Sequence, residues 1–83
     1  MQDRGAVIAF KPSSGRVALR TGDGCFVLAE QTDAGVLREG ANLHGNMQVV
    51  GPETWSEEGE QARYEVFVLG RGLPQEAVEM EMR

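Results

Sequence analysis

The sequence has few of the residues that stabilise very small domains by covalent or metal links. Among its 83 residues there is one cysteine, Cys25, and one histidine, His44. Neither an internal disulfide nor a cysteine–histidine metal cage can therefore form. No apolar run is long enough for a membrane-spanning helix, and the first residues lack the pattern of a secretory signal. We expect a protein of the reducing cytoplasm without metal, cofactor or membrane contact.

Positive charge and aromatic rings are also scarce. Thirteen acidic residues oppose eight basic ones, for a net charge of −5, and aromatic residues make up 6% of the chain. This balance excludes a strongly cationic coat for nucleic acid. The charge is uneven, however, since residues 1–20 carry +3 and residues 21–83 carry −8. The first quarter of the chain can therefore still contact a polyanion.

Glycine, in contrast, is abundant and separates short runs of β-branched and aromatic residues, which is typical of a small antiparallel β protein. The predicted strands span residues 4–10, 16–21, 25–30, 42–50 and 62–69. The last of these runs becomes apolar on both faces at its end. Between the fourth and fifth runs, residues 51–61 are rich in glutamate and predict a polar loop with Trp55 in its middle.

These runs predict one all-β domain over residues 1–72, a five-stranded, antiparallel, OB-like barrel. Closure would remove strand edges that so small a domain cannot easily cover. Residues 73–83 form a C-terminal tail whose secondary structure has two interpretations. Pro74 and the helix-favouring residues after it suit a helix, whereas Val78, Met80 and Met82 alternate with charged residues as in a strand. We expect a tail with some helical content.

Five short motifs follow one another in order along residues 4–68. They are Gly5-Ala6-Val7-Ile8-Ala9-Phe10, the glycine-led segment 15–19, Cys25-Phe26-Val27-Leu28, Leu37-Arg38-Glu39-Gly40 and Gly59-Glu60-Gln61-Ala62. In this order they resemble the cold-shock domain, a five-stranded OB fold. The resemblance implies binding of single-stranded nucleic acid by base stacking on aromatic side chains of the second and third strands, over a basic surface.

Most aromatic positions of that family hold other residues here. Ala9, Arg16, Ala18 and Leu28 stand at four of them, and only Phe10 and Phe26 remain at matching positions. Since each stacked base contributes about 1–3 kcal/mol, their loss removes several kcal/mol of binding free energy. The binding face that the resemblance implies comprises Phe10, Lys11, Arg16, Ala18, Arg20, Phe26 and Leu28.

The residues do not assemble a nucleophile–base pair, a metal cluster or a cofactor loop, so we expect a binding module rather than an enzyme. The sequence slightly favours a protein-interaction domain, in which a protein partner or a second copy covers Phe26 and Leu28. Trp55 is a candidate partner anchor, since tryptophan is enriched at interfaces; the alternative is that it caps the barrel. The other candidate function is weak binding of single-stranded nucleic acid. Two simpler interpretations stay open: the arginines only solvate the sheet, and the tail covers the apolar residues.

Overall fold

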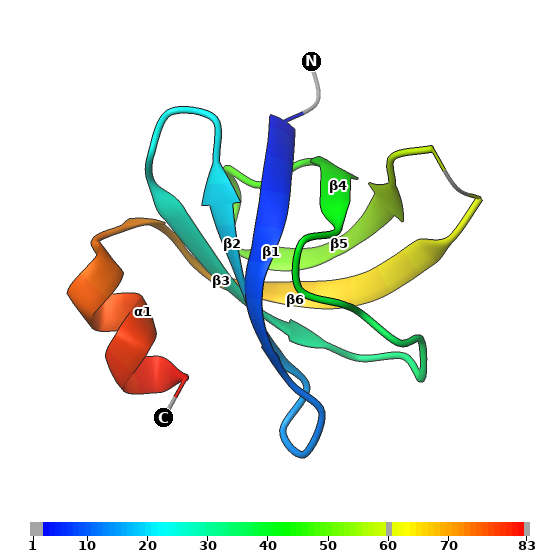
Figure 1. The fold of residues 1–83 in the computed structure, drawn as a ribbon, viewed down its shortest axis with the longest axis horizontal. Coiled ribbons are helices and arrows are strands. Elements are labelled where there is room, and N and C mark those ends of the chain that lie inside the picture. The colour runs from blue at the N-terminus through cyan, green and yellow to red at the C-terminus, as the bar shows by residue number, and fades with distance from the viewer. Residues whose placement is uncertain (1–2, 60, 83) are drawn as a thin grey trace.

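The computed structural model describes residues 3–59 and 61–82. Four residues of the predicted segments lie outside the described residues. They are residues 1–2 at the start of the predicted domain, position 60 in the predicted polar loop and residue 83 at the end of the predicted tail. Within the described part the chain forms six strands and one helix (Figure 1). In chain order these are β1 (Asp3–Lys11), β2 (Arg16–Thr21), β3 (Phe26–Gln31), β4 (Asn42–Gly45), β5 (Gly51–Glu57), β6 (Arg63–Leu73) and α1 (Gln75–Glu81).

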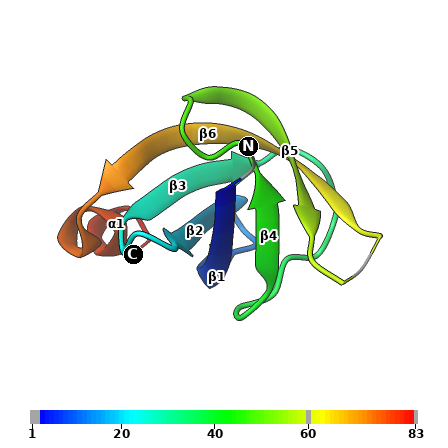
Figure 2. The ribbon, with the colours of Figure 1, turned by 90° about the horizontal axis from the view of Figure 1, so that it is seen from above.

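The strands close into an antiparallel barrel in the order β1-β2-β3-β6-β5-β4, and β4 pairs back onto β1. Two consecutive three-stranded units, β1–β3 and β4–β6, thus join along β3–β6 and β1–β4 (Figure 2). The predicted all-β antiparallel barrel is confirmed, and so is helix in the tail. The predicted count of five strands is wrong by one.

The additional strand lies where the sequence predicts a polar loop. Residues 51–57 form β5, which pairs with β6 in a continuous register from Gly51↔Val68 to Ser56↔Arg63. The predicted fourth strand instead ends at Gly45, whose φ of +156° belongs to a region that favours glycine. Val49 and Val50, expected within that strand, are exposed in the segment that leads to β5.

The barrel interior is filled by side chains that alternate along the strands. The core cluster comprises Val7, Val17, Leu19, Val27, Ala29, Leu37, Leu43, Met47, Trp55, Tyr64, Val66 and Val68. The alternation predicted for residues 16–21 is confirmed for its inward positions, because Val17 and Leu19 are fully buried. A chain of this size can bury a core of about this extent and little more.

Asp33 holds the irregular link between β3 and β4 against the barrel. Its carboxylate accepts hydrogen bonds from the Glu65 N–H at 2.7 Å and the Gly35 N–H at 3.0 Å, and from the Gln31 side chain. Burial acts to raise the pKa of Asp33, but these hydrogen bonds together outweigh it and lower the pKa below its usual value. The link is therefore fastened to β6 by an ionised carboxylate.

Helix α1 packs on the outside of the barrel over β2 and β3. Both ribbon views place α1 beside these strands (Figures 1 and 2). Ala18 and Leu28 are paired across β2 and β3 and alternate with core residues, so their side chains point outward. They are nevertheless 0% and 5% exposed, and Val78 of α1 is 3% exposed. Arg16 Nη1 and Glu81 Oε2, 2.6 Å apart, tie the helix to β2.

Candidate binding surfaces

The face implied by the cold-shock resemblance is divided by α1 rather than open. Its central residues, Ala18 and Leu28, lie buried beneath the helix, so the prediction that they are available for contact is wrong. Arg16, from the same face, is paired with Glu81 of the helix. The structure thus supports the interpretation that the tail covers the apolar residues of this face.

The remaining residues of that face lie at its two ends. Arg20 and Phe26 are paired across β2 and β3, where Arg20 is exposed and Phe26 half-buried. At the other end, Lys11 is paired with Arg16 across β1 and β2, and Phe10 packs partly buried against the core. The structure therefore brings the seven predicted residues onto neighbouring strands but does not leave them as one accessible surface.

Trp55 is fully buried, at 0% exposure, in the core cluster. Its indole Nε1–H donates a hydrogen bond to the Asn46 carbonyl at 2.9 Å, which satisfies the polar end of the ring. The prediction of an exposed partner anchor is therefore wrong, because the small core takes up the largest side chain available. The acidic segment around it concealed the inward alternation of β5.

Exposed apolar side chains gather instead on the outer face of β5 and β6. Phe67 and Leu69 of β6 are 42% and 37% exposed, and Pro52 of β5 is paired with Phe67. Val50 immediately precedes β5, where the register of the pair would place it opposite Leu69. We call Val50, Pro52, Phe67 and Leu69 the β5–β6 patch. The sequence signal for it was the apolar end of the run 62–69, which is apolar on both faces.

A second exposed feature combines positive charge with an aliphatic floor. Arg4 and Arg20 border a shallow depression of about 390 Å³ over β1 and β2, in which Ala6 and Ile8 also take part. Arg4 Nη2 lies 3.5 Å from Glu58 Oε1, and both side chains are largely in solvent, so this ion pair is weak. The depression can accept an anionic group.

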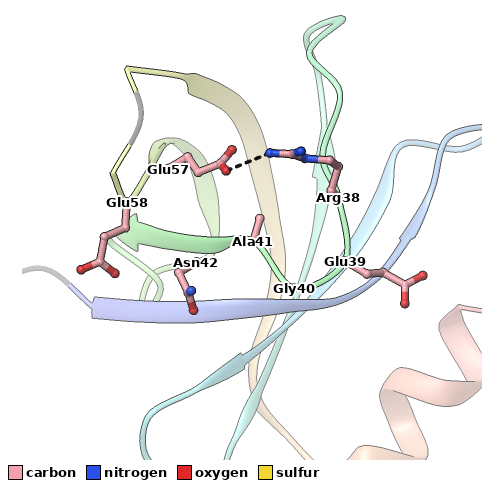
Figure 3. Close-up of a pocket in the computed structure, with 7 residues that line it drawn as sticks. All are labelled: Arg38, Glu39, Gly40, Ala41, Asn42, Glu57 and Glu58. Carbon is pink, nitrogen blue, oxygen red and sulfur yellow. Dashed lines mark ion pairs between the residues drawn. The ribbon is translucent and has the colours of Figure 1, made fainter.

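A third feature surrounds the carboxylate of Glu57. It is a shallow pocket of about 330 Å³ lined by Arg38 and Glu57 among others (Figure 3). Glu57 is 8% exposed; its Oε1 accepts a hydrogen bond from the Tyr64 hydroxyl at 2.8 Å, and its Oε2 lies 3.5 Å from Arg38 Nη2. Both oxygens are thus engaged within the protein. This carboxylate joins the end of β5 to β6 and to the loop that carries Arg38, whereas the sequence predicted a solvated loop glutamate.

Three further features bear on function: metal-binding groups, membrane-spanning helices and similarity to known proteins. Among the described residues no group of three or more His, Cys, Asp or Glu side chains is placed to hold a metal ion. No helix in this part of the chain is both long and apolar enough to cross a membrane. No known family model matches the chain, and searches of curated proteins and of solved structures find no similar protein.

Proposed function

We propose that this chain is a small, non-enzymatic binding module of the cytoplasm whose partner is a protein, bound at the β5–β6 patch. The observation that carries the proposal is the exposure of Phe67 and Leu69 side by side with Pro52 and Val50 on one face of a closed barrel. Contiguous exposed apolar side chains are characteristic of interaction surfaces. A single free cysteine agrees with a reducing compartment.

The way in which strands pair restricts how a partner can bind. Because the described strands close on themselves, this part of the chain offers little free strand edge for an added β-strand. Contact must then be made through side chains on the outer surface. Phe67 supplies the largest apolar area of the patch and stands between Pro52 and Glu30 on the flanking strands.

Charge indicates the character of the partner. Glu30 and Glu65 lie on the strand face that carries Phe67, and residues 21–83 as a whole carry −8. A complementary surface would present apolar side chains at its centre and lysine or arginine at its rim. The rim charges would mainly raise the association rate and its salt dependence, while the apolar centre would supply affinity.

Affinity capture with matched variants tests this proposal. The immobilised wild-type chain, a Phe67→Ser/Leu69→Ser variant and a Val36→Ser control are compared; Val36 is exposed but lies in the β3–β4 link. We expect one protein to be retained by the wild type and the control and lost from the double variant. With that partner purified, binding should weaken by at least about tenfold in the double variant, as for a central interface residue. Equal binding by all three chains would refute the patch as the contact surface.

A second candidate function, weak binding of single-stranded nucleic acid, is supported by Arg4 and Arg20 around their aliphatic depression and by the cold-shock resemblance. Arginine can contact phosphate and stack on bases. Titration of the ¹⁵N-labelled chain with oligo-dT and oligo-U at low salt separates the two functions. Salt-sensitive shifts at Arg4, Arg20 and Phe26 would support the nucleic-acid function, and their absence at millimolar ligand would reject it.

A further inference from the structure

The outer face of β2 and β3 presents a small apolar surface to α1, and we call this surface the β2–β3 groove. Its floor is Ala18 and Leu28, which stand opposite each other in the strand register and lie outside the core cluster. Val78 of α1, also outside that cluster, is almost completely buried. These three residues therefore form a separate small apolar contact on the outside of the barrel.

Charge on the helix and charge on the groove are opposite. The seven residues of α1 include Glu76, Glu79 and Glu81 and no basic residue. On the strands, Arg16 contacts Glu81 at 2.6 Å, and its register partners are Lys11 on β1 and Glu30 on β3. Two cations against one carboxylate leave this end of the face with a net positive charge. The groove thus combines an aliphatic floor with a basic end and fits an acidic amphipathic segment.

The helix that now fills the groove is poorly stable by itself. Seven residues are too few for a stable isolated helix, and Pro74 at its N-cap provides no side-chain capping hydrogen bond. The preceding Gly72 has a φ of +60°, so the connection to β6 turns at a conformationally free residue. These features favour local release of α1 while the barrel core stays intact.

From these observations we propose that the β2–β3 groove is a binding site for a short acidic amphipathic segment of a protein partner, which takes the place of α1. The site shares no residue with the β5–β6 patch, although Leu28 is paired with Gly70, next to Leu69. The two proposals are therefore tested with different variants. The aliphatic floor favours a peptide over nucleic acid, because Ala18 and Leu28 offer no aromatic surface on which a base could stack. While docked, α1 competes with the partner, and release of α1 raises the apparent affinity.

Peptide binding to the full-length chain tests the groove directly. The probe is a fluorescent synthetic peptide with the sequence of residues 73–83, measured by anisotropy against the wild type and Val78→Asp, which releases α1 without touching the core cluster. We take the docked form of α1 to be about tenfold more populated than the released form, and the effective concentration of the tethered helix to be on the order of 1 mM. Dividing this concentration by the population ratio gives a dissociation constant of about 0.1 mM for the peptide at the open groove. We expect Val78→Asp to bind the peptide at least about tenfold more tightly than the wild type.

A charge exchange then locates the peptide. In the Val78→Asp background, Arg16→Glu should weaken binding by at least about threefold, and a peptide carrying Glu81→Lys should restore it. The matched control Arg63→Glu lies on β6, away from α1, and should leave binding unchanged. The single fluorescent Trp55 in the core verifies that each barrel is folded. In case Val78→Asp disturbs the barrel, Glu81→Lys in the full chain gives a second, milder release of α1.

Three results would overturn the proposal. The first is the absence of saturable peptide binding to folded Val78→Asp up to about 1 mM, roughly ten times the expected dissociation constant. The second is equal weakening by Arg16→Glu and Arg63→Glu. The third is that Val78→Asp gains affinity for oligo-dT and none for the peptide, since the uncovered face would then be a nucleic-acid surface.

Discussion

Replacement of Trp55 by phenylalanine provides the sharpest test of how this barrel is held together. The indole is fully buried and its N–H bonds the Asn46 carbonyl at 2.9 Å. Phenylalanine keeps a ring in the core but removes the second ring of the indole and the donor. If Trp55 instead served an external partner, the same substitution would leave stability nearly unchanged.

The expected loss can be worked out from three contributions. Loss of about 50 Å² of buried apolar surface costs about 1.2 kcal/mol. A residual cavity of about 50 Å³ costs a similar amount, about 1.2 kcal/mol. The lost hydrogen bond adds about 0.5–1 kcal/mol, at the lower end because Asn46 is exposed and its carbonyl can be hydrated. Trp55→Phe should therefore lower the free energy of unfolding by about 3 kcal/mol, out of about 4–12 kcal/mol for a domain of this size.

Thermal and urea unfolding followed by far-ultraviolet circular dichroism measure this loss without relying on the tryptophan. The melting temperature should fall by about 12–24 °C, and the urea midpoint should fall at unchanged slope. Phe67→Leu is the matched control, because Phe67 is an aromatic residue of the same sheet that is 42% exposed; its cost should stay below about 1 kcal/mol. A decrease of less than about 4 °C for Trp55→Phe would refute the account of Trp55 as the central core residue.

Three further substitutions examine the barrel at other points. Gly45→Ala would place its Cβ 2.7 Å from a carbon of the tryptophan ring at a φ that disfavours side chains, and should cost about 2–4 kcal/mol by urea unfolding. Tyr64→Phe removes the hydroxyl that donates to Glu57, and should cost about 1–3 kcal/mol by thermal unfolding; an unchanged midpoint would show that the bond contributes nothing. Asp33 has a lowered folded-state pKa, so its stabilisation is present above the unfolded-state pKa near 4 and is lost as pH falls through the lower folded-state value. Asp33→Asn should therefore be less stable at pH 7 and lose less stability on acidification, whereas an unchanged pH profile of the urea midpoint would contradict the role of its hydrogen bond from Glu65.

The strands that the sequence predicts well are those whose two faces differ. In β2, Val17 and Leu19 alternate with Arg16 and Arg20, and the structure places the first pair in the core. Such a pattern predicts which side of the strand faces the core as well as the strand itself, since a shift of the pairing register by one residue would bury both arginines. The helix was partly predictable from Pro74 and the helix-favouring residues after it, but neither Val78 nor Met80 alone indicates which side is covered.

Strand β5 was not predictable in this way, because its polar residues are stabilised by contacts with residues that are distant in the sequence. Glu57 is buried through its hydrogen bond from Tyr64 and its ion pair with Arg38, and neither partner can be recognised from the local pattern. Glu53 and Thr54 give the segment the composition of a loop, although the pairing with β6 supplies the ladder that makes it a strand. Tertiary pairing here overrides local propensity.

Tertiary packing also explains which side chains stand on the outer face of β2 and β3. The small Ala18 allows α1 to approach the strands, and the aliphatic Leu28 packs with it at the face that Val78 covers. A large aromatic side chain at either position, as base stacking requires, would fill the space that the helix occupies. The absence of stacking rings and the presence of a docked acidic helix are therefore two aspects of one surface. The β5–β6 patch has no such cover among the described residues, and for this reason Phe67 and Leu69 stay exposed whereas Leu28 is buried.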